Sequence, residues 1–413
     1  MISKGKILCI KNRPFFETFA DIMFFVWLII GFLYEYTAFG RAALFIFAVS
    51  VGLLILFKTS IYERKKSHLS AFNLYFISYA GFLIYTYWHM NYSGMVINYS
   101  VASKMFGTIC LNGVFYYLVY KYCIVKNDIK GVLQIYLMAY TVILLYFLLK
   151  VNVNIFSGRL GTVIGINSNS IALCCINCAL ILLYDYAEKR KSKNIILIAV
   201  MIFFILISGS RKGILGVAVG FILYACLGGG IRRIKNFIIA AATIVILYFL
   251  IMNVDVIYNI IGVRLEELLS FFVGGDTEEA SLYVRNQYNN LGWSYVSENP
   301  WYGYGLDCFK EIKGAYSTYS HNNYLELMFS VGTIGTALYY FGYIYILFGH
   351  IKMLIKYKAV ESKLFIVIIV TQMILEYAFV SYFSRQSIVL IVMGLASLRL
   401  MKNKFVYRRV KNV

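Results

Sequence analysis

The chain has 413 residues, of which 61% are hydrophobic and 14% are charged, and its formal net charge is +20 at pH 7. Soluble globular proteins contain about 45–50% apolar and about 25% charged residues, so this composition excludes an ordinary soluble domain. The basic residues lie in short segments between apolar runs rather than on one soluble face, which argues against a nucleic-acid partner.

Apolar runs of about 20 residues, the length at which an α-helix crosses a bilayer, recur along the whole chain. Helices satisfy their own backbone hydrogen bonds in lipid, so we predict an all-α, polytopic integral membrane protein with about twelve transmembrane helices. The first run has no small-residue cleavage site behind it and is interpreted as a retained helix. The predicted spans are 17–34, 42–57, 69–88, 101–120, 131–149, 168–185, 194–210, 212–227, 236–252, 322–349, 363–381 and 386–401.

The distribution of basic residues predicts the topology. If the N-terminus is cytoplasmic, loops on that side receive most of the 39 Lys and Arg residues, as is typical of cytoplasmic loops. Both termini are therefore predicted to be cytoplasmic. We divide one integrated domain into membrane helices one to nine (1–252), one large external loop (253–321), and helices ten to twelve with a basic cytoplasmic tail (322–413).

The external loop holds nine of the chain's 19 acidic residues, and two cationic or titratable positions stand out around it. Arg211 follows a tight reversal in which Gly209 and Gly213 supply backbone freedom. An arginine at the membrane boundary can also simply snorkel to water, so both explanations stay open. His321 lies where the loop re-enters the membrane, and a neutral imidazole can accept a proton near pH 7.

Two further patterns allow more than one interpretation. Arg159 begins a glycine- and asparagine-rich segment (157–172) that is either an ordered turn or an ordinary loop. Cys174, Cys175 and Cys178 could form a metal cluster, but we favour plain packing because cysteine in an apolar helix behaves as a small hydrophobe.

Three stretches resemble the superfamily of O-antigen ligases and Wzy-type polysaccharide polymerases. They are Ser210-Arg-Lys-Gly213; Arg285 through Trp293 to Glu298-Asn-Pro-Trp-Tyr-Gly-Tyr-Gly305; and Ser320-His-Asn-Asn-Tyr-Leu-Glu through Gly335. Their order and placement, covering roughly 157–345, make the resemblance specific. The sequence departs from the family pattern at Ser168, where proline is often found, and at Ser330, where an acidic residue is common.

The resemblance implies a glycosyltransferase of the GT-C-like membrane type, acting on undecaprenyl-diphosphate-linked glycans at the external face of the bacterial cytoplasmic membrane. It implies that His321 is a general base and that Arg211 and Arg285 stabilise the diphosphate leaving group, since arginine matches phosphate oxygens bidentately. Arg159, Asn169, Lys212, Asn322 and Tyr304 are assigned to substrate binding. The chain has no Asp-x-Asp sequence, so neither a metal nor another cofactor is expected.

Within this superfamily we favour a polymerase of O-antigen, capsule or exopolysaccharide, whose donor and acceptor are both lipid-linked repeat units. The main alternative is an O-antigen ligase that transfers the glycan to lipid A core. A flippase or transporter of lipid-linked oligosaccharide is the alternative from another class, although the sequence shows no internal repeat of the transporter kind. A flippase and a chain-length regulator protein are the protein partners that this family implies.

Overall fold

The computed structural model describes residues 13–34, 37–58, 73–151, 158–228, 231–263, 265–266, 280–315 and 317–411. Within these ranges the chain is helical and contains no β-strand. The predicted all-α class is therefore confirmed for the described residues. Residues 264, 267–279 and 316 of the predicted external loop lie outside them.

Every predicted span overlaps a helix, although several helix ends differ from the predicted bounds and residues 69–72 of predicted span 69–88 lie outside the described residues. The long helices are α2 (Arg13–Leu33), α3 (Ala38–Lys58), α5 (Leu74–Tyr92), α6 (Tyr99–Lys126), α7 (Ile129–Val151), α9 (Ser168–Lys189), α10 (Ser192–Ile207), α11 (Arg211–Cys226), α12 (Ile231–Asn253), α15 (Ala280–Glu298), α16 (Asn323–Tyr357), α17 (Glu361–Glu376) and α18 (Arg385–Lys411). Short elements are α8 (Leu160–Ile164), α13 (Asp255–Ile257), the π-helix η1 (Tyr258–Gly262) and the 3₁₀-helix η2 (Cys308–Glu311).

Six of the described helices are long and apolar enough to cross a membrane, and a bent pair formed by residues 237–253 and 255–262 would be a seventh. The six lie in α2, α3, α6, α7, α9 and α16. These lengths and compositions are those of a multi-pass membrane protein. The count of twelve spans and the orientation of the termini stay predictions.

Two details of the predicted helices are wrong. Span 363–381 was expected to continue to residue 381, but α17 ends at Glu376. The backbone N–H groups of Ser381 and Tyr382 instead donate to the side chain of Asn323, which draws the chain away from the helix axis. Gly213 does not supply unusual backbone freedom to the reversal between α10 and α11, since its φ is not positive. It lies inside α11, where a Cβ would meet Ile205 at 2.7 Å, so its small size permits close helix packing.

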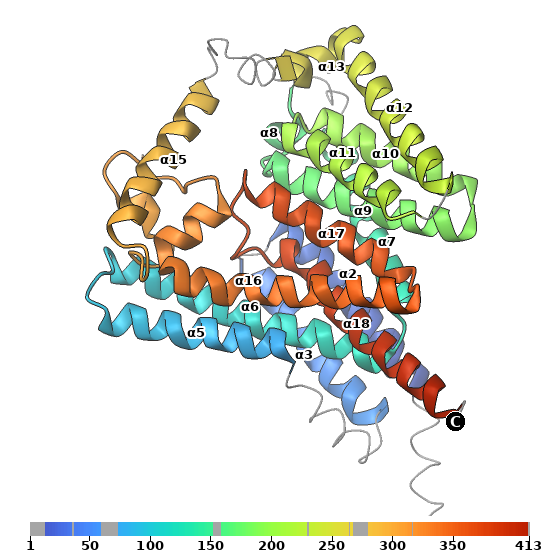
Figure 1. The fold of residues 1–413 in the computed structure, drawn as a ribbon, viewed down its shortest axis with the longest axis horizontal. Coiled ribbons are helices and arrows are strands. Elements are labelled where there is room, and N and C mark those ends of the chain that lie inside the picture. The colour runs from blue at the N-terminus through green and yellow to red at the C-terminus, as the bar shows by residue number, and fades with distance from the viewer. Residues whose placement is uncertain are drawn as a thin grey trace, which may run out of the picture.

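The long helices run roughly alongside one another, with α15 at one end of the bundle and the C-terminus of α18 at the opposite end (Figure 1). Helix α16 packs against α5, α17, α18 and α15, while α11 packs against α9, α12 and α17. Helices α16 and α11 therefore both pack against α17. This shared neighbour becomes important for the candidate site.

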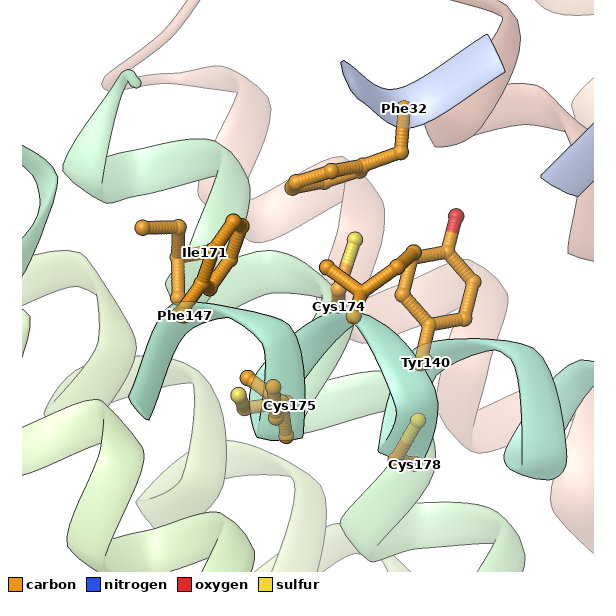
Figure 2. A pocket seen from close by; sticks show the side chains of 9 residues that line it. Phe32, Tyr140, Phe147, Ile171, Cys174, Cys175 and Cys178 are labelled. Carbon is orange, nitrogen blue, oxygen red and sulfur yellow. The ribbon is translucent and has the colours of Figure 1, made fainter. Parts of the chain in front are cut away.

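The cysteine-rich stretch of α9 packs against neighbouring helices. Cys174, Cys175 and Cys178 line an apolar pocket together with Phe32 of α2 and Tyr140 of α7 (Figure 2). All three sulfur-bearing side chains are buried. Among the described residues no group of three or more His, Cys, Asp or Glu side chains is arranged to hold a metal ion.

Helix α16 is broken at Gly332, which has φ 63° and ψ −172°. The turn from Asn299 to Gly305 docks on this break through backbone hydrogen bonds. The N–H groups of Tyr304 and Gly305 donate to the carbonyl oxygens of Phe329 and Ser330 at 2.7 and 2.8 Å, and Thr333 N–H donates to the Pro300 oxygen at 2.8 Å. Backbone groups that a break leaves without helical partners are satisfied in this way.

Both sides of this contact need glycine. A Cβ at Gly332 would overlap the Trp301 carbonyl group, and a Cβ at Gly303 would lie 2.5 Å from the Phe329 oxygen. The φ values at Gly332 and Gly303 are also positive, at 63° and 77°, a region that side-chain-bearing residues rarely adopt. The two family-like stretches around 299–305 and 320–335 therefore form a single structural unit.

Candidate active site

Four cationic side chains from three separate parts of the chain converge near the starts of α11 and α16. Lys212, in the first turn of α11, interacts electrostatically with Arg159, Arg211 and Arg285. Arg159 precedes α8, Arg211 begins α11, and Arg285 lies on α15. We call Arg159, Arg211, Lys212 and Arg285 the cation cluster.

The reversal between α10 and α11 holds part of this cluster in place. Gly209 has φ 61°, and a Cβ there would lie 2.8 Å from Cγ of Arg159. The absence of that Cβ lets the arginine lie across the turn, where its Nε donates to the Ser208 carbonyl oxygen at 3.4 Å. Gly209 was correctly predicted as a turn residue, and its second role is to give room to Arg159.

Ser210 and Asn169 join the starts of α11 and α9. Ser210 caps α11 by accepting the Gly213 N–H at 3.3 Å, and its hydroxyl donates to Oδ1 of Asn169 at 2.8 Å. Asn167 caps α9 by accepting the Asn169 N–H at 2.9 Å. The segment before α9 is therefore an ordered turn, and the Asn169 side chain helps to fix the helix start from which Arg211 and Lys212 extend.

His321 lies between two tyrosine rings beside the cation cluster. Its ring stacks on Tyr288 of α15 with centroids 6.3 Å apart and an interplanar angle of 18°, and the Tyr319 ring is 4.4 Å away. Burial first, and then the positive charges of Arg285 and Lys212, lower the pKa of His321 to about 4. The imidazole is therefore neutral at pH 7 and able to accept a proton.

The residues on either side of His321 are fixed by hydrogen bonds. Asn322 caps α16 by accepting the N–H groups of Tyr324 and Leu325 at 3.0 and 3.3 Å. The Ser320 N–H donates to the buried carboxylate of Glu326 at 2.8 Å. His321 itself has φ 62°, an uncommon backbone conformation for a residue with a side chain. The flanking bonds hold that conformation, so the histidine is presented from a fixed backbone.

Tyr304 lies apart from these residues, in a cluster of apolar side chains beneath α15. Its hydroxyl donates to the Tyr295 carbonyl oxygen at 3.1 Å, and its ring lies 5.2 Å from that of Phe329. Its backbone belongs to the turn that docks on the α16 break. The structure therefore brings His321, Asn322 and the cation cluster together. It places Tyr304 in the turn 299–305 that docks on α16, which we call the supporting turn.

The structure adds residues that the sequence did not single out. Tyr288 and Tyr319 flank His321, and the connector between α17 and α18 accepts a hydrogen bond from Lys212 through the Ala378 carbonyl oxygen. An aromatic residue two positions before the histidine was a usable signal for Tyr319. Tyr288 and Ala378 are brought in by tertiary packing, and no local pattern marks them.

Residues 196–340 match a family model described as O-antigen ligase. This segment is therefore similar to the O-antigen ligase family. The recognition made from the sequence motifs is thereby confirmed, and the matched segment includes Arg211, Lys212, Arg285, Tyr304 and His321. Arg159, Asn169 and the α17–α18 connector lie outside the matched residues. No curated protein matches the chain.

Proposed function

We propose that the protein is a polysaccharide polymerase that transfers a glycan from undecaprenyl diphosphate to a sugar hydroxyl of a lipid-linked repeat unit. The observation that carries the proposal is the gathering of three arginines and a lysine beside a neutral histidine. Like charges repel at short range, so a cluster of this kind is suited to an anionic ligand such as a diphosphate.

In the proposed reaction His321 accepts the proton of the acceptor hydroxyl. As that oxygen forms a bond to the anomeric carbon of the donor glycan, the bond from this carbon to the diphosphate oxygen breaks. The electron pair leaves with undecaprenyl diphosphate, so negative charge increases on its oxygens. Arg211 and Arg285 stabilise that charge, because fixed cations act most strongly where charge develops.

Lys212 and Arg159 assist binding of the same diphosphate in this mechanism. Lys212 supplies a point charge, whereas the arginine guanidinium groups supply planar pairs of donors. Asn169 and Asn322 hold the helix starts from which Lys212 and His321 extend, and we propose that both amides also contact the sugars. Tyr304 keeps its proposed sugar-binding role only if a substrate reaches the supporting turn.

An O-antigen ligase is the second candidate, and the match to a family described as O-antigen ligase supports both reactions equally. Both reactions use the same donor and the same base, and they differ in the acceptor. The polymerase uses a second lipid-linked repeat unit, whereas the ligase uses lipid A core. A flippase that delivers the donor and a chain-length regulator are the partners expected with the polymerase.

The test is to incubate purified protein in lipid nanodiscs with an undecaprenyl-diphosphate-linked repeat unit and to separate the products by size. A ladder of lipid-linked oligomers supports the polymerase. A product formed only when lipid A core is added supports the ligase. Transport of intact donor across a vesicle membrane without a new glycosidic bond would refute both.

The proposed location of the site, on the external face of the bacterial cytoplasmic membrane, has its own test. Reporter tags near Arg190 should be cytoplasmic, and a tag near Gly275, which lies outside the described residues, should be external. A cytoplasmic report from Gly275 would contradict the proposed use of an externally displayed donor.

A further inference from the structure

The connector between α17 and α18, residues 377–384, contacts both the cation cluster and the start of α16 beside His321. The Lys212 ammonium group donates to the Ala378 carbonyl oxygen and lies 5.9 Å from the centre of the Phe379 ring. The N–H groups of Ser381 and Tyr382 donate to Oδ1 of Asn323 at 2.8 and 3.0 Å. Asn323 is the first residue of α16, two positions after His321. One short segment thus ties the cation cluster to the helix start behind the histidine.

The Asn323 amide can satisfy these partners in only one orientation. Its Oδ1 accepts both N–H groups of the connector, while its Nδ2 donates to the Tyr340 hydroxyl at 2.8 Å. A rotated amide would place its NH₂ group against two N–H donors. The side chain is fully buried, at 0% exposure, so water cannot replace a lost partner.

Glu376, the last residue of α17, completes this network. Its carboxylate accepts the Tyr340 hydroxyl at 2.8 Å, the Ser381 hydroxyl at 2.6 Å and Nε2 of Gln372 at 3.1 Å. The side chain is also 0% exposed. A carboxylate is costly to bury unless it is hydrogen-bonded, so each of these bonds constrains its donor. The result is a closed network that joins α16, α17 and the connector.

We propose that Asn323 is a positioning residue that fixes the connector against the start of α16 and thereby sets Lys212 and His321 in one geometry. The inference rests on the proposed function, in which His321 and the cations act on a shared substrate. Asn323 does not itself face the reacting atoms. Gln372, Glu376 and Ser381 lie outside the matched segment, so the site depends on a part of the chain beyond that segment.

The physical basis is the sensitivity of group transfer to geometry. A base and an anion-binding cluster must both meet one substrate, and a displacement of about 1 Å can cost about a hundredfold in rate. His321 and Lys212 lie on different helices, and Lys212 is bonded to the same connector that Asn323 holds. Loss of the Asn323 contacts would let the two groups move independently.

The experiment compares Asn323→Ala, Tyr340→Phe and a matched control in the full chain, purified in nanodiscs. Tyr340→Phe removes only the hydroxyl that orients the amide, and it keeps the ring that stacks on Tyr324 at 4.9 Å. Tyr79→Phe is the control, since it also removes a buried hydroxyl, which donates to the Ile109 carbonyl oxygen at 2.7 Å.

Two properties are measured. The first is kcat and KM with the lipid-linked repeat unit. The second is the rate at which diethyl pyrocarbonate modifies His321 across a pH series, followed by mass spectrometry, which requires no catalytic activity. The groups that face this imidazole are Arg285 and Tyr288 from α15, Lys212 from α11, and Tyr319. The rate therefore reports whether those groups keep their places.

For Asn323→Ala we expect kcat to fall about tenfold to a hundredfold, in keeping with the cost of small displacements, while KM changes little. His321 should be modified faster and with a shifted pH midpoint. Tyr340→Phe should show the same changes to a smaller extent, and Tyr79→Phe should behave as wild type. If Asn323→Ala does not fold, Tyr340→Phe decides the question by the same measurements.

The proposal is overturned if Asn323→Ala and Tyr340→Phe melt at lower temperature but keep the wild-type kcat and the wild-type His321 modification profile. Failure of the proposed function has a different signature. In that case the wild-type protein makes no product from the lipid-linked donor, while the modification profile of His321 still reports on positioning.

Discussion

The two motif-bearing regions within the matched segment differ in the charged groups near them. In the turn 299–305, backbone N–H and carbonyl groups are bonded to the broken helix α16. Polar groups around His321 are hydrogen-bonded as well, but Lys212 there also lies within electrostatic reach of three arginines. Polar groups that satisfy one another stabilise a fold, whereas like charges held together indicate a ligand of opposite charge. The first region is therefore interpreted as support and the second as the place of chemistry.

The largest expected effect comes from replacing His321, the proposed base. His321→Ala should lower kcat by about 10²–10⁴-fold, the usual contribution of a general base, while binding of the lipid-linked donor stays nearly intact. Turnover and donor binding are measured on the same preparation. A folded, correctly inserted alanine variant that still polymerises at the wild-type rate would remove His321 from the mechanism.

Arginine-to-lysine changes test the cation cluster more selectively. Arg211→Lys and Arg285→Lys keep the charge but lose the planar fork, and each should lose about 10²-fold in turnover, the scale found when one charge-stabilising donor is removed. Arg41→Lys, at an exposed position of α3, is the control and should be neutral. Wild-type turnover in both test variants would rule out the clamp.

A change in the supporting region should affect stability first. Gly332→Ala places a Cβ against the Trp301 carbonyl and forces a strained backbone, which costs about 1–3 kcal/mol before the clash is counted. The melting temperature in detergent should therefore fall by several degrees. Gly107→Ala in α6 is the control, because a Cβ there meets nothing within 4 Å. An unchanged melting temperature for Gly332→Ala would show that the turn does not dock on α16.

The smallest expected effect concerns the pH profile of activity, in which only the acid limb should shift. His321 acts in its neutral form, so activity falls as the pH drops through its pKa, which is about 4 in the free protein. A bound diphosphate adds negative charge near the imidazole and should raise that pKa. The acid limb of kcat, which reports the substrate complex, should thus lie at higher pH than that of kcat/KM. If the acid limbs of kcat and kcat/KM lie at the same pH, His321 does not lie near the bound diphosphate.

Much of the helical architecture was predictable because apolar length acts locally along the chain. The same holds for Asn322, whose capping role follows from its place before a helix, and for Gly209 in the tight reversal. The end of α17 was not predictable. Hydrophobicity continues past Glu376, but the backbone donors of Ser381 and Tyr382 bond to Asn323, more than fifty residues earlier, and no local pattern marks that contact.

The candidate site was predictable in part for the same reason. The residue type alone indicates the chemistry of an arginine or histidine side chain, so His321, Arg211 and Arg285 could be named from short motifs. Tyr304 shows the limit of that approach. A motif residue can serve a neighbouring helix instead of a ligand, and the two uses differ only in tertiary contacts such as the bond from the Tyr304 hydroxyl to Tyr295.

The break at Gly332 also sets how α16 relates to the thickness of the bilayer. The helix has 35 residues, and at 1.5 Å per residue the part from Thr333 to Tyr357 is about 37 Å long. That part alone exceeds the hydrocarbon core of about 30 Å. The nine residues before the break are therefore not needed to cross it. They are able to lie at the depth of the lipid headgroups, where the phosphates of a lipid-linked donor reside, and the break allows that segment to take its own direction there.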